Sequence, residues 1–224
     1  MGLIKLVNAG NVARAPNKQK NIEPITRIPK ILTGTKTENS SAEIIKNYRE
    51  YVDDITNGIV IKAKKNLVGV NTHLANKIVY HALSNNLIKE LKNSKSIKPE
   101  VFFNKETRFD FLIEQNKKKI FVEVKNVTLF RDKETAEFPD AITSRGSKHL
   151  LTLIDAIKKG YKSYLIFLVQ IQNMENFKIA KDIDADYYKN YLIAKKAGVN
   201  FLAYRCYINS KKIFIEKKLK IINE

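Results

Sequence analysis

The sequence contains a single cysteine among its 224 residues, and this scarcity excludes two kinds of site. Cys206 cannot form an internal disulfide, and one thiol cannot build a metal site that needs several cysteines. The surrounding residues 201–208 are mostly apolar. We therefore expect Cys206 to be a small buried side chain.

Long hydrophobic segments are also missing. The longest apolar run, Tyr164–Val169, is far too short to cross a bilayer. The first residues, Met1–Val7, lack the longer apolar stretch and the small-residue cleavage site of a signal peptide. The sequence therefore predicts a cytoplasmic protein with no membrane partner.

Negative charge is scarce relative to positive charge. Lys and Arg total 41 against 23 Asp and Glu, which gives a formal net charge of +18. Such a charge favours polyanions such as nucleic acids as partners. The alternative is a compositional bias toward Lys, Ile and Asn across a whole genome, and charge alone does not separate the two. Hydrophobic residues make up 44%, enough for a packed core.

The first 57 residues differ in pattern from the rest of the chain. Residues 8–30 contain three prolines and no sustained periodicity, and residues 33–41 resemble a linker. One short amphipathic helix is expected within residues 41–52. We predict a divergent or partly disordered extension over residues 1–57, followed by one domain over residues 58–224.

From residue 58 the hydrophobic pattern predicts an α/β fold with a mixed central sheet flanked by helices. A hairpin is expected from Ile59–Lys62 and Asn66–Val70. Apolar spacing, capping residues and glycines set the remaining elements. We expect helices at 72–91, 143–159 and 184–197, and strands at 99–103, 107–113, 120–127, 163–170, 201–208 and 213–222.

Two neighbouring strands carry the residues with the most informative chemistry. Side chains alternate along a strand, so Glu123 and Lys125 share one face while Val122 and Val124 point to the other. A polar turn over residues 114–119 lets the preceding strand return antiparallel, which can bring Asp110 near Glu123. Two carboxylates suit Mg²⁺, and a lysine beside them can stabilise negative charge on a phosphodiester. Candidate catalytic residues are Asp110, Glu123 and Lys125, with Asp110 and Glu123 as metal ligands.

A Glu-x-Lys pair on a strand is often only a solvated ion pair, so its neighbours matter. Residues 137–140 add further carboxylates ahead of the expected helix. That helix begins with Arg145, Lys148 and His149 within its first turns, and a basic helix start suits a phosphate backbone. The alternative for these three side chains is an ordinary solvated helix end.

Several motifs occur in one order along the chain and together resemble the sugar fermentation stimulation protein family. The resemblance covers residues 60–224, and it includes the later runs 184–187 and 197–204. The motifs that carry it are Val68–Thr72 (VGVNT), Arg108–Phe111 (RFDF), Val122–Thr128 (VEVKNVT), Phe138–Ala141 (FPDA) and Arg145–Leu150 (RGSKHL).

The resemblance implies a restriction-endonuclease-like core with the Asp…Glu-x-Lys arrangement of such nucleases. It places Asp110, Glu123 and Lys125 at the metal site, and it implies DNA binding and a regulatory role in the utilisation of sugar, particularly maltose. Mg²⁺ is the expected cofactor. Whether the DNA is single- or double-stranded stays open, as does oligomeric state, including a homodimer. The expected DNA-binding residues are Arg108, Asn126, Arg145, Lys148 and His149.

This sequence departs from the family pattern in three places. Similar proteins begin with a small β-barrel of the oligonucleotide-binding type, and we hypothesise that residues 1–57 have lost or replaced it. Tyr80 and His81 stand where acidic residues often complete a metal shell. His81 is either a substitute ligand or simply packed or solvated. Ala75 replaces an expected proline, which should loosen the start of the helix.

Three functions are compatible with these observations. The first is a DNA-binding regulator that retains a nuclease-like site. The second is a Mg²⁺-dependent endonuclease or exonuclease that hydrolyses DNA. The third is a decayed, truncated remnant without activity, which would bind DNA weakly and without sequence preference.

Overall fold

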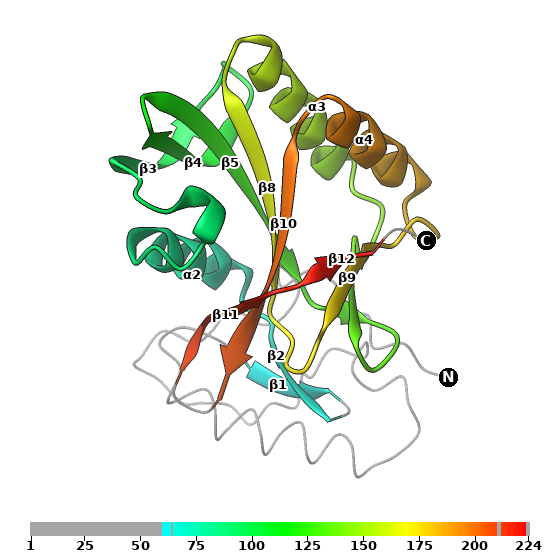
Figure 1. Ribbon diagram of the computed structural model, residues 1–224. Helices are drawn as coiled ribbons and strands as arrows, with labels where there is room; N and C mark the ends of the chain where they lie inside the picture. The colour runs from blue at the N-terminus through cyan, green and yellow to red at the C-terminus, as the bar shows by residue number, and fades with distance from the viewer. Residues whose placement is uncertain (1–59, 64, 210–211, 223–224) are drawn as a thin grey trace, which may run out of the picture.

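The structure is a computed structural model that describes residues 60–63, 65–209 and 212–222 (Figure 1). The predicted extension over residues 1–57, its expected helix, the replacement of the β-barrel and the domain boundary near residue 58 lie outside the described residues. All of the described residues belong to the predicted α/β domain.

The described part of the chain is organised around a six-stranded mixed sheet. The strands β5, β8 and β10 run parallel to one another, while β4, β3 and β11 are antiparallel to their neighbours. This arrangement confirms the predicted fold class. In spatial order the strands are β11 (Ile213–Lys218), β10 (Asn200–Ile208), β8 (Lys162–Val169), β5 (Lys118–Val127), β4 (Arg108–Gln115) and β3 (Ser96–Phe102).

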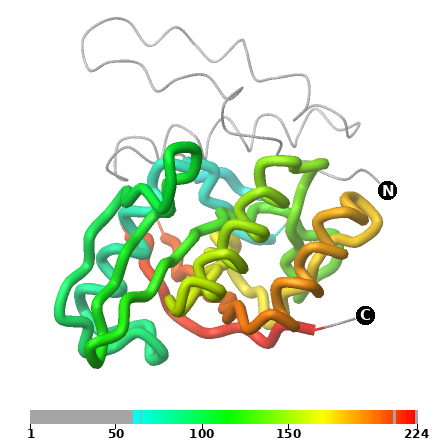
Figure 2. The backbone as a smooth tube through the Cα atoms, turned by 90° about the horizontal axis from the view of Figure 1, so that it is seen from above, coloured from blue at the N-terminus to red at the C-terminus, as the bar shows by residue number. Residues whose placement is uncertain are grey.

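Helices cover both faces of this sheet. The helices α3 (Ser144–Lys158) and α4 (Ala185–Lys196) lie side by side on one face, and α2 (Thr72–Ser84) lies on the other (Figures 1 and 2). Residues of β8 alternate between the two resulting core clusters, which explains why 163–170 is almost continuously apolar. No helix in the described residues has the length and apolar character needed to span a membrane.

Two smaller sheets flank the main one. The hairpin of β1 (Val60–Ala63) and β2 (Asn66–Gly69) agrees with the prediction. The other sheet, absent from the prediction, has the order β12 (Lys220–Ile221), β9 (Asn176–Ile179), β7 (Thr135–Phe138) and β6 (Leu129–Phe130). Its strands have only two to four residues, too few to show a period. The strand predicted at 213–222 divides at Leu219, since β11 pairs with β10 and β12 with β9.

The strand predicted at 99–103 lies at Ser96–Phe102, and two further boundaries were wrong for local reasons. The helix predicted to reach Leu91 ends at Ser84, because Asn86 adopts a φ of 57° and the chain turns into the short 3₁₀ helix η2 (Lys89–Leu91). The turn predicted at 114–119 is tighter, because Asn116 and Lys117 adopt φ values of 49° and 62° and both strands extend into it. Cys206 is buried, as expected.

The start of α3 is anchored to the start of α4 by backbone capping. The Thr143 hydroxyl accepts from the Gly146 N–H at 3.0 Å. The Asp184 carboxylate accepts from the Thr143 N–H and the Tyr187 N–H, both at 2.8 Å. Gly146 permits this packing, because a Cβ there would lie 2.8 Å from the Thr143 hydroxyl and 3.1 Å from the Tyr187 ring. The first turn of α3 is therefore held firmly above β5.

Candidate functional site

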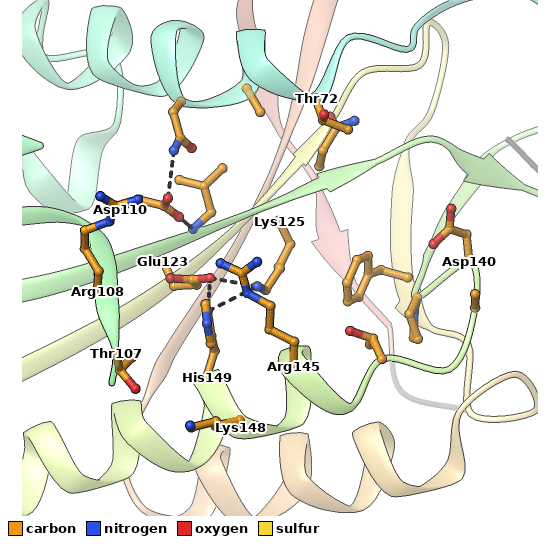
Figure 3. Close-up of a pocket in the computed structure, with 18 of the residues that line it drawn as sticks. Thr72, Thr107, Arg108, Asp110, Glu123, Lys125, Asp140, Arg145, Lys148 and His149 are labelled. Atoms are coloured by element: carbon orange, nitrogen blue, oxygen red, sulfur yellow. Dashed lines mark hydrogen bonds and ion pairs between the residues drawn. The ribbon is translucent and has the colours of Figure 1, made fainter. Parts of the chain in front are cut away.

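A pocket of about 970 Å³ lies between the β3–β4 hairpin, the beginning of α2 and the first turns of α3, with residues of β5 between them (Figure 3). All of the predicted site residues line it. These are Arg108, Asp110, Glu123, Lys125, Asn126, Arg145, Lys148 and His149. Side chains from two strands and a helix thus meet in one cavity.

Asp110 is turned toward β5 by an interruption in its own strand. Phe109 and Phe111 pack in different core clusters, so the alternation of β4 breaks between them, at Asp110. Such interruptions re-aim side chains beside functional sites. The Asp110 carboxylate accepts from the Val124 N–H at 2.7 Å through Oδ2 and from the Asn76 side chain at 2.7 Å through Oδ1. Both oxygens are therefore fixed in place.

Glu123 is only 3% exposed and is the most enclosed carboxylate of the pocket. Its Oε1 accepts from the Lys125 Nζ at 2.7 Å and is in close contact with the Nδ1 of His149 (Figure 3). The His149 Nδ1 also lies 3.5 Å from Lys125 Nζ. The other carboxylate oxygen of Glu123, Oε2, is buried and has no hydrogen-bond partner among the described residues. A buried carboxylate oxygen left unpaired is unfavourable unless a ligand satisfies it.

The two carboxylates influence each other electrostatically. Burial, followed by the charge of Glu123, raises the pKa of Asp110 to about 6, despite hydrogen bonds from Val124 and Asn76 that act in the opposite direction. Burial acts to raise the pKa of Glu123 as well, but Lys125 and His149 outweigh it and the pKa is lowered. Once Asp110 has lost its proton, two negative charges share a poorly solvated space. A divalent cation there would relieve their repulsion.

In the metal-free protein we expect Asp110 to make stability depend on pH. Its folded pKa of about 6 lies above its ordinary value of 3.8. The stabilisation that protonated Asp110 gives to the folded state is therefore fully present below pH 3.8, and it is lost as pH rises through about 6. Between pH 5 and pH 8 the free energy of unfolding of wild type should fall by about 1 kcal/mol more than that of Asp110→Asn. Urea titrations of both proteins in chelator measure this difference, and equal pH slopes would contradict the raised pKa.

The basic side chains occupy different environments. Lys148 Nζ pairs with the Glu106 carboxylate at 2.8 Å, and Arg108 Nε pairs with Glu100 at 2.7 Å, and all four side chains are largely exposed. Arg145 is exposed and its guanidinium has no hydrogen bond or ion pair with any described residue. The alternative of a solvated helix end thus describes Arg145 and Lys148. It does not describe His149, which is buried because α3 packs over β5.

Asn126 faces the pocket with a fixed orientation. Its Oδ1 accepts from the Gln170 side chain at 2.6 Å, and Gln170 is fully buried. Because this bond occupies Oδ1, the amide N–H groups of Asn126 remain available as donors. Gly69 allows Gln170 to lie there, because a Cβ at that position would come within 2.4 Å of Gln170 Oε1.

Two residues near the carboxylates were missed by sequence reasoning. Asn76 donates a hydrogen bond to Asp110. The sequence feature that marks it is a polar residue between the core-facing positions Ala75 and Ile78 of α2. Tyr187 is fully buried, and its hydroxyl has no partner among the described residues. Burial, followed by the charge of Glu123, raises the pKa of Tyr187 well above its ordinary value. Apart from its place in the run 184–187, the sequence gives no sign of this position.

Other residues noted in the sequence lie outside this cluster or have ordinary roles. His81 is exposed in the last turn of α2 and does not line the pocket. Ala75 is buried, and the helix still begins at Thr72 with Asn71 as its cap, so the absent proline does not move the start. Glu137 is buried and pairs with Arg131, whereas Asp140 lines the pocket.

The donor set limits what kind of metal site is feasible. Within the described residues, no group of three or more His, Cys, Asp and Glu side chains is arranged to hold an ion. A cation in this pocket would therefore take Asp110 and Glu123 as carboxylate ligands and complete its coordination with water or phosphate oxygens. Mg²⁺ commonly binds in that way. The unpaired Oε2 of Glu123 fits such a ligand.

Comparisons with known proteins give consistent matches. Residues 73–212 match the family model described as "Sugar fermentation stimulation protein RE domain". The "Sugar fermentation stimulation protein homolog" of Pelagibacter ubique (strain HTCC1062) is 76% identical over 164 residues, covering 73% of this chain and 71% of that protein. The homolog from Pseudoalteromonas atlantica is 42% identical over 157 residues, covering 69% and 67%.

A solved structure is similar as well. The structure of Pyrococcus furiosus SfsA in complex with Ca²⁺ superposes with a TM-score of 0.68 at 28% sequence identity. The match covers 73% of this chain and 71% of that chain. The arrangement of strands and helices that positions the pocket is therefore shared with an experimentally determined protein.

Proposed function

This chain belongs to the sugar fermentation stimulation protein family, and we propose that it binds DNA in the pocket around Asp110 and Glu123 and hydrolyses phosphodiester bonds there with a divalent cation. The observation that carries the proposal is the buried carboxylate pair, in which Glu123 has an unpaired oxygen and Lys125 lies 2.7 Å from the other oxygen. Unsatisfied buried oxygens and perturbed pKa values gather at functional sites, and this carboxylate pair has both, since burial and the charge of Glu123 raise the pKa of Asp110 to about 6.

Asp110 and Glu123 would hold the cation. The solved SfsA of Pyrococcus furiosus is a complex with Ca²⁺, and Ca²⁺ and Mg²⁺ are both hard cations that prefer oxygen ligands. When bound, such an ion polarises a phosphodiester and lowers the pKa of an attacking water. The hydrogen bonds from Asn76 and Val124 keep the Asp110 oxygens oriented for this role.

Lys125 and His149 act on Glu123 before a cation or DNA binds. Their contacts with Oε1 keep Glu123 ionised in a buried position. Lys125 is partly exposed to the pocket, so its ammonium can also donate to a phosphate oxygen as negative charge develops there. Because these groups are placed before substrate arrives, little reorganisation is needed in the reaction.

The rim supplies contacts to the DNA backbone. Arg145 and Lys148 lie in the first turns of α3, where the helix dipole adds to their attraction for phosphate. Asn126 offers amide donors from β5. These contacts do not read bases, so they support binding and positioning rather than sequence specificity.

We expect Arg145→Ala to weaken DNA binding by several-fold. The slope of log binding constant against log salt concentration should decrease in size by about one, because one counterion fewer is released. Its guanidinium has no partner within the described residues, so no internal ion pair is lost and the fold should be unaffected. Fluorescence anisotropy at several salt concentrations measures both quantities. Lys196→Ala, an exposed charge in the last turn of α4, is the matched control. Equal losses in the two variants would mean that binding follows net charge alone.

A regulator of sugar utilisation is the second candidate, supported by the family's name and by the net charge of +18. It requires DNA binding but no cleavage. A remnant without activity is less consistent with eight predicted residues lining a single pocket. All three candidates make different predictions for the same experiment.

That experiment titrates the purified protein onto a labelled mixed-sequence duplex and a single strand, with Mg²⁺ or with chelator, at two salt concentrations. The proposal expects salt-dependent binding and cleavage only with Mg²⁺. Binding without cleavage in Mg²⁺ would favour the regulator and contradict the nuclease. Failure to bind either form at low salt would favour the remnant.

A further inference from the structure

Two apolar side chains at the pocket are unusually exposed. Ile142 is 82% and Phe102 is 67% exposed, while every other exposed large hydrophobic residue in the described part of the chain lies between 37% and 47%. Both Ile142 and Phe102 line the pocket that contains Asp110 and Glu123. Single exposed hydrophobic residues are ordinary, but the two most exposed ones at the same cavity indicate a ligand with apolar surface.

The two residues belong to different walls of the pocket. Phe102 ends β3, and the Arg108 guanidinium lies 5.8 Å from its ring centroid. Arg108 is itself paired with Glu100, so the ring has an ordered neighbour on one side while most of its surface is open. Ile142 follows Asp140 in the segment that leads into α3. Figure 3 shows Arg108 and Asp140 on opposite sides of Glu123 and Lys125.

On the proposed function, the ligand combines a phosphate group at the carboxylate pair with flat apolar surface beside it. A DNA strand has both, but a continuous duplex hides its base faces inside the stack. Only unpaired ends, splayed junctions and single strands present free base faces to a protein. An aromatic ring that stacks on such a base typically strengthens binding by about tenfold.

We infer that Phe102 and Ile142 hold unpaired bases on either side of the reacting phosphodiester, so that the pocket takes single-stranded or splayed DNA in preference to continuous duplex. The inference rests on the proposed function and specifies its substrate class. The basic side chains of the same pocket, Arg108, Arg145 and Lys148, favour a nucleic acid over an apolar segment of a protein. Arg108 beside Phe102 would also bring a cation near a stacked base.

The test compares a short single strand, a duplex with several unpaired nucleotides at one end, and a blunt duplex of the same sequence, all in chelator. Each carries 2-aminopurine at an end, because the fluorescence of this base reports stacking. Wild type should bind the first two about tenfold more tightly than the blunt duplex. Phe102→Ala should lose about tenfold on those two and change little on the duplex, and Ile142→Ala should lose less. Phe102→Trp should retain the preference.

Leu192→Ala on α4, where the side chain is 44% exposed, is the matched control and should bind as wild type does. Thermal melting of each variant checks folding. Equal binding of duplex and single strand by wild type would overturn the inference while leaving the proposed function standing, whereas no binding to any DNA would overturn the proposed function itself. If both alanine variants bound DNA normally but lost a concentration-dependent self-association, the two residues would form a protein interface and the inference would be wrong.

Discussion

Replacing Asp110 with asparagine should abolish metal-dependent DNA cleavage, with a loss of at least about 10³-fold in rate. The carboxylate is one of two that would hold the cation, and a metal ion supplies several kcal/mol of charge stabilisation in such reactions. Asparagine keeps the size of the side chain, so the pocket should keep its shape. DNA binding should persist or strengthen, because a negative charge has been removed from a site for phosphate.

The matched control is Asp155→Asn. Asp155 is an exposed carboxylate on α3 that pairs with Lys158 at 3.2 Å, away from the pocket. This variant should cleave at the wild-type rate, and thermal melting should show that both variants are folded. Cleavage that survives in Asp110→Asn at the wild-type rate would mean that the activity arises from another site or from a contaminating nuclease.

Replacing Lys125 with methionine should destabilise the protein by about 3 kcal/mol at pH 8 in chelator. Methionine keeps the unbranched shape of the lysine stem without the terminal ammonium, so it leaves the buried, ionised Glu123 without its partner at 2.7 Å. Breaking a buried pair in this way typically costs about 3–5 kcal/mol. We place the cost at the lower end, because His149 still contacts Glu123. Urea unfolding measures the free energy.

Two further variants separate this effect from a general loss of packing. Adding Glu123→Gln to Lys125→Met removes the uncompensated charge and should recover much of the lost stability. Lys158→Met breaks the exposed pair with Asp155, which should cost at most about 0.5 kcal/mol. If Lys125→Met were as mild as Lys158→Met, Glu123 would not depend on Lys125 for its burial.

The central strands were predictable because their side chains follow simple periods. Val122 and Val124 alternate with Glu123 and Lys125, and the structure places the two valines in the core cluster beneath α2. The continuous apolar run of β8 reflects burial on both faces, since helices cover both sides of the sheet. The strands β6, β7 and β9 were missed because each is too short to show a hydrophobic period. Their pairing also depends on partners that are distant in the chain.

The candidate site was only partly visible in the sequence. A hairpin between β4 and β5 was enough to place Asp110 and Glu123 on neighbouring strands. The break in alternation at Asp110 and the contact from Asn76 depend on how α2 packs against the sheet. Helical spacing likewise grouped His149 with Arg145 and Lys148, but only the packing of α3 over β5 buries it against Glu123. Local sequence patterns identified the candidate site residues, whereas tertiary packing determines the environment of each one.

Titration calorimetry of Mg²⁺, and of Mn²⁺ in parallel, into the metal-free protein without DNA tests most directly whether Asp110 and Glu123 hold a divalent cation. Wild type and Asp155→Asn should each show saturable binding that weakens as pH falls below about 6, because Asp110 must lose its proton to bind. Asp110→Asn should show no saturable binding under the same conditions. Equal binding by Asp110→Asn and wild type, or no binding by wild type at pH 8, would contradict a metal site at this carboxylate pair.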